Sequence, residues 1–158
     1  MSEWLGAAVL LVSAGLVSTV LVRDHAAALK DLEALYDMIS YIRDNIEHLM
    51  KPLPDIFETY ANERLETCGF LPEVRRTDLR HAWDGQTFAV SGEARELVQE
   101  FVRTIGNGYR AEELRLCEYT IGRLRGILDR ARTDAAGQLR LYRTVPMLLA
   151  LSVILILL

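Results

Sequence analysis

The stretch "LRLCEYTIGRLRGILDRARTDAA", residues 114–136, carries the clearest periodic pattern in the chain. Its apolar residues recur in alternating steps of three and four, which is the a/d repeat of helices that pack at a shallow angle. The pattern predicts a long helix that lies along a partner helix, with an interhelical seam that thins to alanine toward its end. This seam consists of Leu114, Cys117, Ile121, Leu124, Leu128, Ala131 and Ala135.

A second apolar stripe, between residues 27 and 50, makes that segment the expected partner of the long helix. Its apolar positions also recur at spacings of three and four, as on one face of an amphipathic helix. The opposite face carries acidic and basic residues, Asp31 among them, and is expected to face solvent. The apolar stripe consists of Leu29, Leu32, Tyr36, Ile39, Ile42, Ile46 and Leu49.

A helix-break motif, Pro52-Leu53-Pro54, follows this segment. Proline cannot continue a helix and pushes the residue before it out of the α region, so the helix is expected to stop there. Asp55, with Glu58 three residues later, resembles a capping box. The motif therefore predicts a second amphipathic helix that starts at Asp55 and ends near Gly69.

Residues 70–92 form the least regular part of the sequence. A short helix from Pro72 to Gly85 is expected there, because proline favours the start of a helix and glycine its end. Ser91 is a typical N-cap for the next helix, which the glycine-rich stretch 105–109 should end. Together these segments predict an all-α fold, an antiparallel helical bundle with a long, coiled-coil-like C-terminal helix.

Both ends of the chain are strongly apolar. Residues 4–22 contain no ionisable side chain and are long enough to span a hydrocarbon core, which takes roughly 20 residues of helix. A cleavable signal peptide is the weaker alternative, because the leader is acidic and the apolar stretch is too long. Residues 145–158 are also uncharged but short for a full span, and a buried core helix is the alternative there.

These apolar runs predict a cell-membrane protein in three parts. Residues 1–23 form an N-terminal transmembrane anchor, residues 24–143 a cytoplasmic helical bundle, and residues 144–158 a C-terminal hydrophobic transmembrane segment. Arg23 and Lys30 follow the first run, and cytoplasmic flanks collect such basic residues. The central domain is therefore expected on the cytoplasmic side.

The sequence offers little catalytic chemistry. Its three histidines lie far apart and lack the i, i+4 pairing of a metal-binding helix, and it contains no phosphate-binding loop. We therefore expect no enzyme, no cofactor, no metal and no small-molecule substrate. The net charge of −4 also argues against a nucleic-acid partner. Two cysteines are too few for a disulfide scaffold, and Cys117 is expected to be a small core residue.

The stretch "EVRRTDLR", residues 73–80, is the most exposed-looking charged segment of the predicted bundle. Glu73 and Asp78 offset its basic charge, which disfavours a nucleic-acid patch. We take it as the candidate surface for a protein partner. The candidate contact residues are Arg75, Arg76 and Arg80.

Three stretches of the chain resemble one protein family. The longest, "LKDLEALYDMISYIRDNIEHLMKPLPDIF" at residues 29–57, resembles the opening helix and Pro-Leu-Pro break of the stage III sporulation protein AB family. The upstream "WLGAAVLL" and the closing "LRLYRTVPMLLALSVILILL" resemble the same family at matching ends of the chain. The order and spacing of these stretches carry the resemblance.

The resemblance implies a component of the mother-cell channel apparatus of endospore-forming bacteria, in the membrane that faces the forespore. The cytoplasmic domain of that family is similar to those of type II secretion and type IV pilus platform proteins. The expected partners are a secretion-type ATPase and other membrane subunits of the complex. A membrane-tethered regulator or sensor is the alternative, and a homo-oligomer is left open.

Overall fold

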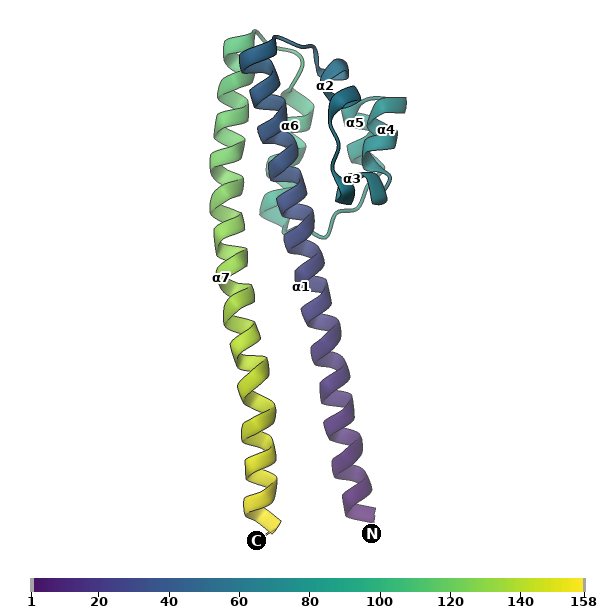
Figure 1. The fold of residues 1–158 in the computed structure, drawn as a ribbon, viewed down its shortest axis with the longest axis vertical. Coiled ribbons are helices and arrows are strands. Elements are labelled where there is room, and N and C mark those ends of the chain that lie inside the picture. The colour runs from purple at the N-terminus through teal and green to yellow at the C-terminus, as the bar shows by residue number, and fades with distance from the viewer. Residues whose placement is uncertain (1, 158) are drawn as a thin grey trace. The chain divides into compact units, whose positions relative to one another are not determined.

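The computed structural model describes the backbone of residues 2–157 and the side chains of residues 25–137. Every regular element in the described backbone is a helix, which confirms the all-α prediction (Figure 1). The helices are α1 (Ser2–Leu49), α2 (Leu53–Thr59), α3 (Glu63–Thr67), α4 (Phe70–Arg76), α5 (Leu79–Asp84), α6 (Gly92–Thr104) and α7 (Arg110–Leu157).

The chain divides into two compact units. One contains Met1–Ala27 and Arg130–Leu158, and the other, here called the helical unit, contains Ala28–Asp129. None of the helices, as far as their residues are described, combines the length and apolarity needed to cross a membrane. The predicted anchors, residues 1–23 and 144–158, lie outside the described side chains, so they stay predictions.

The helix-break motif follows the end of α1 and forms the start of α2. Helix α1 ends at Leu49, and Met50 takes a left-handed backbone conformation with φ of 50°. Helix α2 then begins at Leu53, with Pro52 as its N-cap and Pro54 in its first turn. Proline is tolerated in a first turn because the N–H group that it lacks has no partner within the helix.

The predicted single helix from Asp55 to Gly69 is wrong, because two helices, α2 and α3, occupy this segment. Helix α2 begins two residues before Asp55, so the capping box does not form. The interruption is at Asn62, whose side-chain oxygen accepts hydrogen bonds from the backbone N–H groups of Arg64 and Leu65, at 3.1 and 3.2 Å. An asparagine in this position starts a new helix rather than continuing the old one.

The expected helix from Pro72 to Gly85 is likewise divided in two, α4 and α5. The Asp78 carboxylate caps α5 by accepting a hydrogen bond from the His81 N–H at 2.8 Å. Ser91 caps α6 as predicted, its hydroxyl accepting from the Ala94 N–H at 3.3 Å. The loop after α6 contains Gly106 at φ of 85°, a conformation that glycine adopts without strain.

Helix α7 contacts two neighbours within the helical unit (Figure 1). The Arg110 guanidinium donates to the Ile46 carbonyl of α1 at 3.1 Å, and Arg123 forms an ion pair with Glu93 of α6 at 3.3 Å. The α7 side chains that are buried here are Cys117, Thr120, Leu124, Ile127 and Leu128.

The predicted seam therefore differs in detail from the buried stripe of α7. Cys117, Leu124 and Leu128 are buried, whereas Leu114, Ile121 and Ala131 are half-buried. Thr120 and Ile127 are buried although the a/d pattern leaves them out. A helix that packs on both α1 and α6 buries a wider stripe than a two-helix seam does.

Aromatic rings fill the space between the short helices. Phe70 of α4 meets Phe88 edge-on with ring centroids 5.3 Å apart, and Trp83 of α5 stacks on Phe88 at 5.2 Å. All three residues are buried. Because α2 to α5 have only five to seven residues each, packing of this kind rather than intrinsic helix propensity holds them in place.

Candidate partner-binding face

Arg75, the first residue of the predicted contact patch, is used to hold helices together. Its guanidinium donates to the carbonyl oxygens of Phe57 and Tyr60 at 3.0 and 2.6 Å. It also pairs with Glu66 of α3 at 2.8 Å. The two carbonyls lie at the C-terminal end of α2, where the last carbonyl groups of a helix have no partner within the helix. Through these bonds and the pair with Glu66, Arg75 joins α4 to both α2 and α3.

Arg76 and Arg80 have different surroundings from Arg75. The Arg76 side chain is 74% exposed and pairs with Glu73 at 2.9 Å, and its hydrogen bonds hold the pKa of the Glu73 carboxyl below its usual range. Arg80 donates to the Arg103 carbonyl at the C-terminal end of α6 at 2.9 Å. Arg76 is therefore exposed and bonded within its own helix, whereas Arg75 and Arg80 donate to carbonyls of other helices.

Two adjoining hollows lie beside this stretch, one between α2 and the α4–α5 pair and one that reaches α6. They measure about 170 and 270 Å³ and share Leu53, Asp78 and Leu79, so we treat them together as the α2–α6 groove. The first hollow is lined by Leu53, Pro54, Phe57, Glu58, Val74, Arg75, Thr77, Asp78 and Leu79. The second adds Arg80, Val102, Ile105, Gly106 and Asn107.

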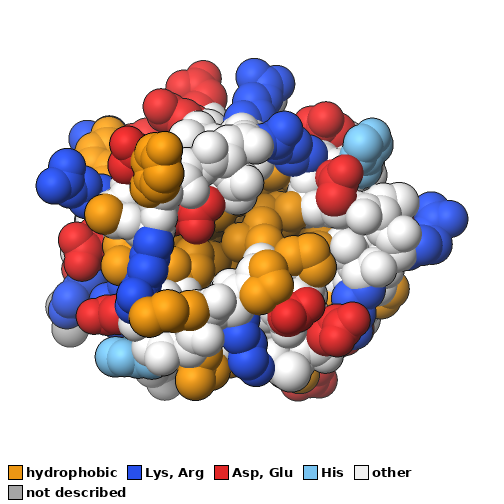
Figure 2. All heavy atoms as spheres, turned by 90° about the horizontal axis from the view of Figure 1, so that it is seen from above, with side chains coloured by type: hydrophobic (Ala, Val, Ile, Leu, Met, Phe, Trp, Pro, Cys, Tyr) orange, Lys and Arg blue, Asp and Glu red, His pale blue; other side chains and the backbone are white. Residues whose placement is uncertain are grey.

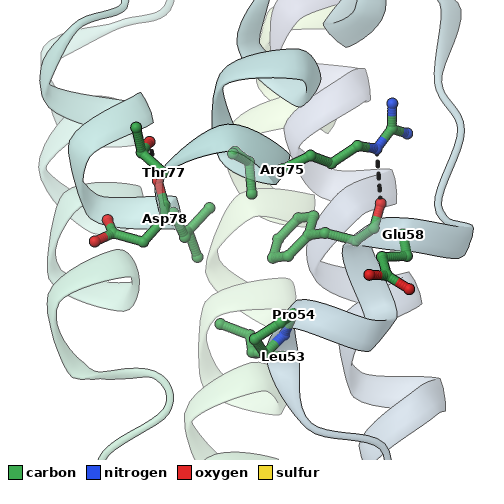
Figure 3. Close-up of a pocket in the computed structure, with 9 residues that line it drawn as sticks. Leu53, Pro54, Glu58, Arg75, Thr77 and Asp78 are labelled. Atoms are coloured by element: carbon green, nitrogen blue, oxygen red, sulfur yellow. Dashed lines mark hydrogen bonds between the residues drawn. The ribbon is translucent and has the colours of Figure 1, made fainter.

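Carboxylates border this groove. In Figure 3, Glu58 and Asp78 lie on opposite sides of the hollow, with Leu53 and Pro54 between them. The Asp78 carboxylate accepts a hydrogen bond from the His81 backbone N–H, and its Oδ2 lies 2.8 Å from Nδ1 of the His81 ring. These hydrogen bonds lower the pKa of the Asp78 carboxyl. On the face of the molecule drawn in Figure 2, apolar side chains lie recessed among charged ones.

The described residues contain no cluster of three or more histidine, cysteine, aspartate or glutamate side chains that could hold a metal ion. Several charged side chains of the helical unit join its segments, among them Asp31, Arg64 and Arg75.

The burial of Asp31 shows that the prediction of a solvent-exposed face of α1 at this residue is wrong. Its side chain is only 4% exposed, and it accepts hydrogen bonds from the Arg64 guanidinium at 2.5 Å and from the Ala89 N–H at 2.9 Å. The carboxylate therefore joins α1 to α3 and to the segment before α6, and it raises the pKa of Arg64. The sequence holds a signal for this burial, because Asp31 lies four and seven residues before the buried Leu35 and Met38.

Replacing Asp31 with alanine is expected to lower the free energy of unfolding by about 2 to 4 kcal/mol. The change leaves the Ala89 N–H without an acceptor and removes a charge-assisted hydrogen bond from Arg64. Urea unfolding of the chain in mild detergent measures the loss. Asp37→Ala, at an exposed position of the same helix, is the control and should stay within about 0.5 kcal/mol of the unmodified protein. Equal losses in the two variants would contradict the role assigned to Asp31.

The comparison with protein families decides what kind of protein this is. The family model described as stage III sporulation protein AB matches residues 3–158. The chain belongs to that family. The match confirms the resemblance seen in residues 29–57 and at both ends of the chain, and it identifies this as a sporulation protein. The search of curated proteins and the search of solved structures found no match.

The two thiols of this sporulation protein are in different surroundings. Cys117 of α7 is fully buried, and burial, with a contribution from Glu113, raises the pKa of its thiol to about 12. Cys68 is half-buried, and its Sγ donates to the Leu65 carbonyl. A thiol reacts as its thiolate, so Cys117 should be inert in the folded protein.

Labelling with a disulfide reagent at pH 8 is therefore expected to modify one thiol in the folded chain and two in urea. The Cys117 thiol ionises at a higher pH in the folded state than in the unfolded state. Between these two pKa values the unfolded state binds fewer protons than the folded state, so stability falls as the pH rises. The stability contributed by Cys117 is thus present at neutral pH and lost as the pH rises toward about 12. Rapid labelling of Cys117 in the folded protein would contradict this assignment.

Proposed function

We propose that the protein is a non-enzymatic scaffold of a sporulation-specific secretion or channel complex. In this proposal the helical unit lies on the cytoplasmic side of the membrane that faces the forespore, and it docks a secretion-type ATPase and other membrane subunits. The family match over residues 3–158 is the observation that carries the proposal. The use of Asp31, Arg64 and Arg75 in joining helices also supports it, because these side chains are not free for chemistry.

The membrane attachment in this proposal rests on the sequence of the two ends. Residues 4–22 and 145–158 carry no charge, and basic residues follow the first run and precede the second. Both segments are proposed to insert in the membrane and to hold the helical unit beside it. Washing of membrane vesicles at high pH tests this, because an inserted chain stays in the membrane fraction. Release of the 158-residue chain by this wash would contradict the proposed attachment.

ATPase docking is tested by co-purification of the 158-residue chain, in detergent, with the secretion-type ATPase of the same sporulating cell. The scaffold predicts a complex that survives gel filtration. Absence of any complex with the unmodified chain would contradict the docking role.

The predicted arginine patch needs its own variant in this assay. Arg76→Glu is suitable because Arg76 is exposed and, among the described residues, pairs only with Glu73 of its own helix. Reversal of Arg75 would instead release α2 and α3. Weaker binding by Arg76→Glu would place the patch in the contact. Unchanged binding would show that the patch prediction is wrong while leaving the scaffold in place.

One observation favours the alternative, a membrane-tethered regulator or sensor. Helix α7 runs without interruption from Arg110 to Leu157, and a continuous helix can carry a displacement along its axis. Insertion of two glycines after Gly137 would interrupt such a helix, since glycine weakens helix interiors. A scaffold should still bind the ATPase after this insertion, whereas a regulator should lose the coupling between membrane and helical unit.

A further inference from the structure

We propose that the α2–α6 groove receives a short partner segment in which an apolar side chain is flanked by lysine or arginine. This inference rests on the proposed docking function and names the surface that performs it. The groove combines a preformed apolar hollow with carboxylates at its border, and each of these features selects one part of such a segment.

The size of the first hollow suits one large apolar side chain. Its volume is about 170 Å³, and an apolar protein cavity of about 150 Å³ is known to accept a benzene ring. Leu53, Pro54, Phe57, Val74 and Leu79 supply the apolar lining. A leucine or phenylalanine side chain from a partner would therefore be removed from water there, which favours binding.

The groove is held in shape before any partner arrives. Arg75 donates to the Phe57 carbonyl, as the dashed line in Figure 3 shows, and it binds the Tyr60 carbonyl and Glu66 as well. These bonds fix α2 against α4, the two helices that form opposite walls of the first hollow. A preformed site avoids the entropy loss of ordering its own walls, which increases affinity.

The charges at the α2 end of the groove are acidic and open to a partner. Glu58 lines the first hollow, and Asp55, which does not line it, lies three residues earlier on the same helix. Both are exposed, and neither forms an ion pair with another described residue. Asp78 lies on the opposite side, and the positive charge of Arg75 is already balanced by Glu66. Basic residues of the partner are therefore expected beside α2 and not at the other end, where Arg80 lies.

The test measures the dissociation constant between the 158-residue chain in detergent and the purified secretion-type ATPase. The double variant Asp55→Lys/Glu58→Lys is expected to weaken binding at least tenfold and to reduce its dependence on salt, because two charge pairs are lost. Leu53→Ser, which alters the apolar lining of both hollows, is also expected to weaken binding about tenfold. Glu96→Lys, at an exposed acidic position in the middle of α6, is the matched control and should bind unchanged.

Thermal melts of each variant separate loss of the groove from loss of the fold. The double charge reversal changes only exposed side chains, so it should melt like the unmodified chain. Normal binding by this folded variant would overturn the groove assignment and leave the docking function intact. Failure of the unmodified chain to bind the ATPase would instead contradict the docking function itself.

A photo-reactive residue in place of Glu58 identifies the occupant. Crosslinking to an ATPase segment with an apolar residue next to lysine or arginine is the expected result. Crosslinking to a second copy of this chain, or to a segment without basic residues, would overturn the proposal.

Discussion

Replacing Leu124 with aspartate is expected to unfold the helical unit. Leu124 is fully buried on α7, in the stripe that faces the rest of the core. A carboxylate at this position would be removed from water without a partner, which costs several kcal/mol. That is a large part of the 5 to 15 kcal/mol by which a typical domain is stable.

Urea unfolding of the 158-residue chain in detergent measures this effect. Trp83 is buried and its fluorescence reports on the helical unit, provided that Trp4, the second tryptophan of the chain, is first replaced by phenylalanine. Arg125→Asp introduces the same residue at the next, exposed position of α7 and should change stability by no more than about 0.5 kcal/mol. If the two aspartate variants unfold at the same urea concentration, the assignment of Leu124 to the core is wrong.

Replacing Phe70 with alanine is expected to lower stability by about 3 to 5 kcal/mol, the usual range for a buried aromatic side chain. Phe70 is fully buried and contacts Trp83 and Phe88 edge-on, with ring centroids 6.5 and 5.3 Å apart. The cavity left behind would also loosen the surroundings of Trp83. Urea unfolding gives the loss, and the near-ultraviolet circular dichroism of Trp83 reports the local change.

Tyr119→Ala is the matched control, because Tyr119 is an aromatic residue that is 58% exposed on α7. It should leave both the unfolding midpoint and the Trp83 signal nearly unchanged. A loss for Phe70→Ala no larger than that for Tyr119→Ala would mean that the aromatic cluster does not stabilise the short helices.

The parts of the fold that sequence predicts well are those determined by local patterns. The Ser91 cap and the end of α1 before Pro52 depend on neighbouring residues only, and both are found in the structure. The apolar repeat of α7 placed Cys117, Leu124 and Leu128 inside the core, because helical periodicity alone puts them on one face.

The two undivided helices, 55–69 and 72–85, were wrong because the local N-caps Asn62 and Asp78 were missed. The other failures involve contacts between segments far apart in the chain. Asp31 is buried because Arg64 and Ala89, 33 and 58 residues later, supply its hydrogen bonds, and no local pattern records such partners. The role of Arg75 in joining helices could not be predicted from sequence for a similar reason. Its main acceptors are the backbone carbonyls of Phe57 and Tyr60, and every residue type has the same carbonyl group.

The candidate groove was also beyond sequence analysis. Leu53 appeared only as part of a helix-break motif, and Glu58 only as half of a capping box that does not form. Their position at a hollow depends on how α2, α4 and α5 pack together. Two residues of the predicted arginine patch, Arg75 and Arg80, line the two hollows, and the patch as a partner contact stays a prediction.

The buried Asp31 carboxylate also affects how the protein is made. Ribosomes add about 5 to 20 residues per second, so Asp31 is synthesised roughly 3 to 12 seconds before Ala89, its partner 58 residues later. Throughout that interval the carboxylate is hydrated, and the apolar side of α1 lacks the cover that later segments provide. Chaperones that recognise uncovered apolar helices therefore have several seconds in which to bind the nascent chain.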